Sequence, residues 1–128
     1  MKEVKMKRYS LGLAVLAAVL LVWLVVNPPR FWLNLTKAVE PSPEVGAQLV
    51  DQYGCRSCHK IGAEGALKAP DLNGSARRAN DPAQVTLRLW LQNPRAVKSN
   101  TAMPNFHLSE SEIEAIVMYL IQLDNQNQ

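Results

Sequence analysis

The chain has 128 residues, a formal net charge of +3 and 48% hydrophobic residues. This length allows one small domain and excludes a large catalytic scaffold such as a (β/α)₈ barrel. The hydrophobic content excludes a chain that is disordered by composition, and two cysteines are too few for a disulfide-stapled scaffold. A basic chain can also indicate a nucleic-acid partner, so the positions of the charges matter.

The positive charge is concentrated at the N-terminus. Residues 1–10 hold four basic side chains and one acidic side chain, whereas residues 41–128 hold eight basic and nine acidic side chains. A nucleic-acid-binding domain carries its basic residues on its folded part. The slightly acidic segment 41–128 therefore argues against nucleic acid as a partner.

An uncharged apolar stretch covers residues 9–26. Eighteen residues at about 1.5 Å each span roughly 27 Å in a helix, close to the hydrocarbon thickness of a bilayer. Because the stretch is longer than a signal-peptide core and no A-x-A-like site follows it, we favour an uncleaved transmembrane anchor over a cleaved signal peptide or a buried helix. The basic end, residues 1–8, predicts a cytoplasmic N-terminus, with the rest of the chain on the periplasmic side of a bacterial inner membrane.

Residues 27–41 are expected to be a juxtamembrane linker with no specific partner, because its three prolines oppose regular structure. Residues 42–128 then form the main domain, which reads as helices joined by long loops. Ser42 followed by Pro43 is typical of a helix start, and Gly54 marks the end of that helix.

The next segment carries the chemistry. Cys55, Cys58 and His59 form a C-x-x-C-H pattern, the attachment motif of c-type haem. Two thiols at this spacing can each form a thioether to one porphyrin, and the adjacent imidazole can then ligate the iron. A structural zinc site, thiol redox chemistry and a plain disulfide are the alternatives. The first lacks a convincing set of four ligands, the second lacks a βαβ context, and the third leaves His59 without a role.

Residues 61–80 are rich in Gly, Ala and Asn and show no periodicity. A loop of this length in a small domain is unusual unless it wraps around a bound group, here the haem that the C-x-x-C-H motif indicates. Asp81-Pro82 predicts a second helix that ends before Asn93-Pro94.

Ser109 and Glu112 form a capping box that opens the last helix. The apolar face of this helix consists of Ile113, Ile116, Val117 and Leu120.

A second axial ligand decides whether a haem is closed, as in electron carriers, or open to small molecules. Met103 is the preferred candidate because it precedes Pro104 in an irregular segment that can project a thioether into a pocket. His107, Met118 and an open site are the alternatives. Met118 lies within the last helix, where a core role is the simpler interpretation.

These motifs occur together in one family. Over about residues 43–123 the sequence resembles the class I c-type cytochromes, on the basis of C-x-x-C-H, A-P-D-L at 69–72, A-M-P-N-F at 102–106 and the last helix. The resemblance implies an all-α class I cytochrome c fold around one covalent haem c, preceded by the transmembrane helix. It also implies that the Pro70 carbonyl accepts a hydrogen bond from His59, that Leu72 packs on the haem, and that Gly46 lies against the last helix near Tyr119.

With its anchor, the chain is also similar to the small haem-bearing components of bacterial nitric oxide reductases. We therefore expect a membrane-anchored monohaem cytochrome that carries single electrons on the periplasmic side in a respiratory chain, without being an enzyme itself. Its expected partners are the bilayer and redox proteins, notably an integral-membrane oxidoreductase complex, with no small-molecule substrate. The alternative is a haem-based sensor or peroxidase-type enzyme with a labile sixth ligand.

Overall fold

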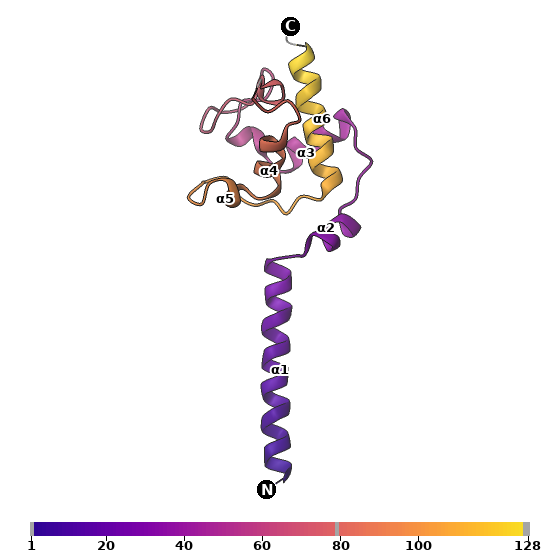
Figure 1. The fold of residues 1–128 in the computed structure, drawn as a ribbon, viewed down its shortest axis with the longest axis vertical. Helices are drawn as coiled ribbons and strands as arrows, with labels where there is room; N and C mark the ends of the chain where they lie inside the picture. The colour runs from indigo at the N-terminus through magenta and orange to yellow at the C-terminus, as the bar shows by residue number, and fades with distance from the viewer. Residues whose placement is uncertain (1, 79, 127–128) are drawn as a thin grey trace. The chain divides into compact units, whose positions relative to one another are not determined.

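The structure is a computed structural model that describes residues 2–78 and 80–126, with side chains from Tyr9 onward. The chain forms two compact units, Met1–Trp32 and Leu33–Gln128. Figure 1 labels the helices of both units.

The first unit is dominated by helix α1, Lys2–Val26. Its segment Tyr9–Val26 has a mean hydropathy of 2.5, and none of it is buried. By length and composition this helix can cross a membrane.

Helix α2, Arg30–Thr36, lies where the sequence predicted an irregular linker. That prediction was wrong for this segment, because Pro28 and Pro29 precede the helix instead of interrupting it, and proline is tolerated at a helix start. Two residues of this segment, Leu33 and Asn34, belong to the second unit. Leu33 is 5% exposed within the second unit, and Asn34 accepts a hydrogen bond from the backbone N–H of Glu110 at 2.9 Å.

Helices α3, Pro43–Gln52, and α6, Glu110–Gln126, form the centre of the second unit. Their predicted caps are confirmed. Ser42 Oγ accepts from Val45 N at 3.2 Å. At the start of α6, Ser109 Oγ accepts from Glu112 N at 3.1 Å, and Glu112 Oε2 accepts from Ser109 N at 2.8 Å.

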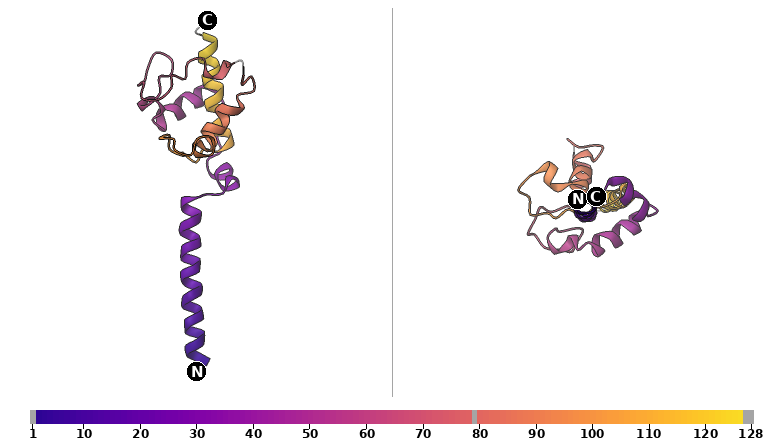
Figure 2. Two further views of the ribbon diagram at one scale, coloured as in Figure 1. Left: turned by 60° about the vertical axis from the view of Figure 1, so that its left-hand side comes forward. Right: turned by 90° about the horizontal axis from the view of Figure 1, so that it is seen from below.

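The two helices pack closely because Gly46 of α3 faces the backbone of α6. A Cβ atom built at Gly46 would lie 2.0 Å from the carbonyl oxygen of Ala115 and 2.8 Å from the Cβ of Tyr119. The expected contact between Gly46 and the last helix is thus present. Figures 1 and 2 show α3 and α6 together with the irregular middle segments beside them.

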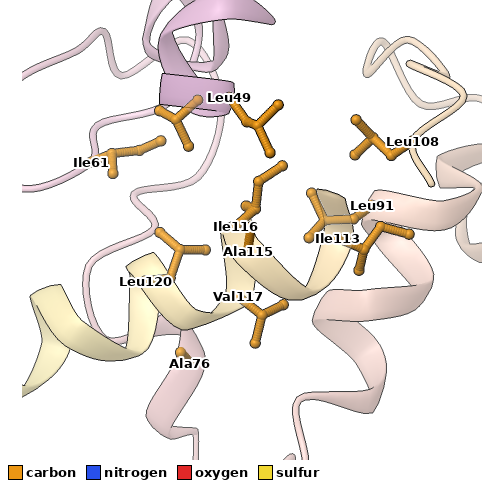
Figure 3. Close-up of a cluster of buried hydrophobic side chains, with 11 residues drawn as sticks. Leu49, Ile61, Ala76, Leu91, Leu108, Ile113, Ala115, Ile116, Val117 and Leu120 are labelled. Carbon is orange, nitrogen blue, oxygen red and sulfur yellow. The ribbon is translucent and has the colours of Figure 1, made fainter. Parts of the chain in front are cut away.

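The hydrophobic core is built around α6. Figure 3 shows Ile116 pointing toward Leu49 of α3, while Val117 points to the other side of the helix. Both α6 side chains are at most 3% exposed. Helix α6 is therefore covered on more than one side. The other buried members of the cluster come from segments throughout the second unit: Val50, Ile61, Ala76, Leu91, Leu108, Ile113, Ala115 and Leu120.

The middle of the chain contains short elements. Two 3₁₀ turns, η1 Cys55–Ser57 and η2 Ser75–Arg77, precede α4, Val85–Gln92, and α5, Pro94–Val97. The predicted start of the second helix at Asp81-Pro82 was too early. Asp81 Oδ2 does accept from the backbone N–H groups of Thr86 and Leu87, at 2.9 and 3.3 Å, but Gln84 adopts φ +53° and delays the helix. Within the described residues, the β-structure consists of one isolated bridge between Ile61 and Glu64.

Candidate haem-binding site

The C-x-x-C-H motif begins immediately after α3. Gly54, with φ +66°, turns the chain out of the helix and into η1. The backbone N–H groups of Cys58 and His59 both donate to the carbonyl oxygen of Cys55, at 3.3 and 3.0 Å. The motif therefore folds as one tight turn that holds two thiols and an imidazole close together.

Arg56, between the two cysteines, ties this turn to both central helices. Its Nη2 donates to the hydroxyl of Tyr119 in α6 at 2.7 Å, and its Nη1 pairs with Asp51 in α3. The sequence did not indicate this structural role, because the partners of Arg56 are set by packing that spacing does not reveal.

The long loop that follows is fastened onto the motif. The carbonyl oxygen of Cys58 accepts from the backbone N–H groups of Lys68 and Ala69, at 3.0 and 2.9 Å. Leu72 N donates to the carbonyl oxygen of Lys60 at 3.0 Å. At Gly65, with φ +108°, a Cβ atom would lie 2.1 Å from the carbonyl oxygen of His59. The loop thus reaches this position only with glycine there, a requirement that no sequence pattern indicated.

This loop places Pro70 against the imidazole. Nδ1 of His59 lies 2.7 Å from the carbonyl oxygen of Pro70. Because a carbonyl can only accept, Nδ1 carries the proton of this hydrogen bond. In the neutral ring, Nε2 then has the free lone pair, which is the form that a metal ligand needs.

The two cysteines differ in exposure: Cys55 is half-buried against the core cluster, and Cys58 is exposed. Burial raises the pKa of the Cys55 thiol, and the neighbouring charge of Arg56 partly opposes that shift.

The segment around Met103 packs against the core cluster. Met103 is partly buried against the cluster of Figure 3, as are Leu72 and Phe106. The backbone N–H of Met103 donates to Thr101 Oγ1 at 3.2 Å. His107, the alternative ligand, adopts φ +49° and donates its N–H to Asn105 Oδ1 at 2.9 Å.

The residues present fit a haem better than a zinc ion. Among the residues that the structure describes, no three His, Cys, Asp or Glu side chains gather where a metal ion could bind. By contrast, the part of the second unit that follows the C-x-x-C-H motif leaves large apolar side chains between 39 and 69% exposed: Leu67, Val85, Leu89 and Val97. Apolar surface of this extent fits a small domain that packs around a large apolar group.

The cytochrome c family model matches residues 43–124, which include both cysteines, His59 and Met103. The chain belongs to the cytochrome c family. Members of this family carry covalently bound haem c, and Cys55 and Cys58 are consistent with that attachment. The expected all-helical cytochrome c fold and haem c cofactor are thereby confirmed.

Several relatives of this cytochrome c are subunits of nitric oxide reductase or of cytochrome c oxidase. It is 32% identical over 97 residues to the C component of nitric oxide reductase from Paracoccus denitrificans, covering 67% of this chain and 65% of that protein. It is 27% identical to the same component from Cereibacter sphaeroides, covering 83% and 76%. It is 28% identical to cytochrome c oxidase subunit 2 of Alkalihalophilus pseudofirmus, of which it spans only 25%.

A solved structure supports the fold. A chain in the crystal structure of SoxXA from P. pantotrophus superimposes with a TM-score of 0.54 at 23% identity, covering 68% of this chain and 85% of that one. At this identity the likeness concerns the fold alone.

Proposed function

We propose that this cytochrome c is anchored by α1 and carries single electrons on the periplasmic side of a bacterial inner membrane. It would do so as a subunit of, or tethered donor to, a larger respiratory oxidoreductase. The observation that carries the proposal is the His59–Pro70 hydrogen bond within the family segment, because it fixes the imidazole in its ligand form. The subunit role is supported by the likeness to the C component of nitric oxide reductases.

Each site residue has a proposed task. Cys55 and Cys58 hold haem c by thioethers, His59 and Met103 are the axial iron ligands, and Pro70 and Leu72 line the pocket. When bound, haem c supplies an iron that takes up and releases one electron. The Pro70 carbonyl keeps the proton on Nδ1 of His59, and the core contacts of Met103 hold its thioether in place.

The ligand set is tested by substitution. Met103→Ala should abolish the methionine-to-iron charge-transfer band of the ferric protein, and Cys55→Ser with Cys58→Ser should abolish haem staining on a denaturing gel. Met118→Leu is the control, since Met118 lies within α6 and should leave the band unchanged. A band that persists in Met103→Ala would exclude Met103 as the ligand. Rapid cyanide binding to the wild-type ferric protein would favour the sensor or peroxidase alternative.

The partner is tested by purifying the native protein in mild detergent. A stable association with an integral-membrane oxidoreductase supports the subunit role. A clean monomer that still exchanges electrons with membranes identifies a tethered donor instead.

A further inference from the structure

We propose that Lys37, in the segment before the family domain, is a positioning residue for the Met103 ligand. Its ammonium group holds the chain segment just after Met103 and so sets how firmly Met103 stays on the iron. The inference rests on the proposed role of Met103 as an axial ligand.

The first support is the set of contacts that Lys37 makes. Its Nζ donates to the carbonyl oxygen of His107 at 2.9 Å and to that of Phe106 at 3.4 Å. These carbonyls lie three and four residues after Met103 and about seventy residues from Lys37 along the chain. One ammonium group thus fastens two consecutive peptide units of the segment that presents the ligand.

The second support is the conformation of that segment. His107 adopts φ +49°, a left-handed conformation that costs free energy for a residue other than glycine and persists only when its surroundings hold it. Lys37 binds its carbonyl oxygen, and Asn105 accepts from its N–H at 2.9 Å. Removing the Lys37 contact releases one of these two restraints.

The third support is that Lys37 is itself held rigidly. Its Nζ lies 3.5 Å from Oε2 of Glu112, whose side chain is 4% exposed, and 5.1 Å from the centre of the Tyr53 ring. Glu112 is fixed in turn by the hydroxyl of Tyr53, which donates to Oε1 at 2.7 Å, and by Ser109 N. A lysine in this setting is an anchored contact and not a mobile surface charge.

The backbone around Lys37 is fastened to the same region. The carbonyl oxygen of Lys37 accepts from Ser109 Oγ at 2.8 Å, and Val39 N donates to Ser111 Oγ at 3.0 Å. Together with Asn34, these bonds join residues 34–39 to the start of α6. The segment between the apolar helix and the family domain is therefore part of the structure that supports Met103.

The test measures how often Met103 leaves the iron. In the full-length ferric protein in detergent, the rate of imidazole binding at saturating imidazole is followed by the loss of the methionine–iron band. Lys37→Met should raise this rate about tenfold, the factor expected when one charge-assisted hydrogen bond is lost. Lys37→Arg, which keeps a charged donor, should restore a rate close to that of the wild type. If Lys37→Met yields no holoprotein, Lys37→Gln replaces it, with an expected rise of several-fold.

Two controls separate positioning from other effects. Lys98→Met removes the same charge from an exposed lysine five residues before Met103 and should leave the rate unchanged. Asp124→Asn weakens the cap on Gly74 N and Ala76 N, so it should lower the melting temperature without accelerating imidazole binding.

The outcomes are distinct. A wild-type rate in Lys37→Met, or in Lys37→Gln where that variant replaces it, overturns the inference while leaving Met103 as the ligand. An equal acceleration in Asp124→Asn also overturns it, because loosening would then be general. A wild-type protein without the methionine–iron band overturns the proposed ligand and this inference together.

Discussion

The buried carboxylate of Glu112 shows how a single residue serves several elements. It caps α6 through Ser109 N, accepts from the hydroxyl of Tyr53 in the α3 C-terminal turn, and pairs with Lys37. A carboxylate removed from water costs free energy unless such partners surround it. Each partner therefore contributes to stability through Glu112 as well as through its own contacts.

The Tyr53 contact gives a pH dependence. Burial, followed by the hydrogen bond to Glu112 and its charge, raises the pKa of Tyr53 well above the ordinary value of 10.0. In the unfolded chain the phenol ionises near that ordinary value, whereas in the folded protein it stays protonated. The stability that Tyr53 contributes is thus full below about pH 10 and falls as the pH rises further.

Tyr53→Phe should remove this dependence. Below pH 10 the variant should be less stable by about 1 kcal/mol, because Glu112 loses one donor. Denaturant titrations at about pH 8 and about pH 10.5 should show a larger loss of stability for the wild type than for the variant. Parallel losses in the two proteins would contradict this assignment.

At the scale of elements, the contact between α3 and α6 depends on the absence of a side chain at Gly46. Gly46→Ala places a Cβ against the backbone of Ala115, which cannot move without moving α6. We expect a loss of about 3 kcal/mol or more in the free energy of unfolding, at the upper end of overpacking effects. Thermal or denaturant unfolding of the full-length protein measures it. Gly12→Ala in α1 is the matched control, since nothing lies within 4 Å of its added Cβ, and it should leave the second unit unchanged.

The helices that the sequence predicted well are those whose signals are local. Ser42 and the Ser109–Glu112 box lie within three residues of the groups they cap, so pattern alone located both helix starts. The start of α4 was misplaced because Asp81 caps groups five and six residues ahead, across a turn at Gln84 that has no glycine to signal it.

The residues of the candidate site also divide into those that a local sequence pattern indicates and those that it does not. The cysteines and His59 follow from a five-residue motif, and Met103 from its place before Pro104. Pro70 came only from the family resemblance, because a loop proline alone does not reveal which group its carbonyl meets. Lys37 was missed because its partners lie about seventy residues away and depend on how the linker packs.

At the scale of the whole molecule, charge and hydropathy divide the chain. The segment with excess positive charge, residues 1–8, precedes the apolar stretch 9–26, and the charges of the remainder are nearly balanced. Basic residues beside a membrane span stay on the cytoplasmic side, so the second unit is expected on the periplasmic side. Attachment of haem c to Cys55 and Cys58 would then take place on that side.

Protease accessibility tests this topology. Trypsin added to intact spheroplasts of the native bacterium should cut the second unit, whose exposed cleavage sites include Lys68, Arg78 and Lys98, and haem staining at the full-length size should disappear. A cytoplasmic marker protein must stay intact in the same sample, and inverted membrane vesicles should protect the haem-bearing unit. The opposite pattern, protection in spheroplasts and cleavage in inverted vesicles, would reverse the orientation. An apolar helix of this hydropathy holds the protein in the bilayer as long as the helix remains part of the chain. Haem-stained protein in the soluble fraction before any trypsin is added would therefore show that α1 does not act as an anchor.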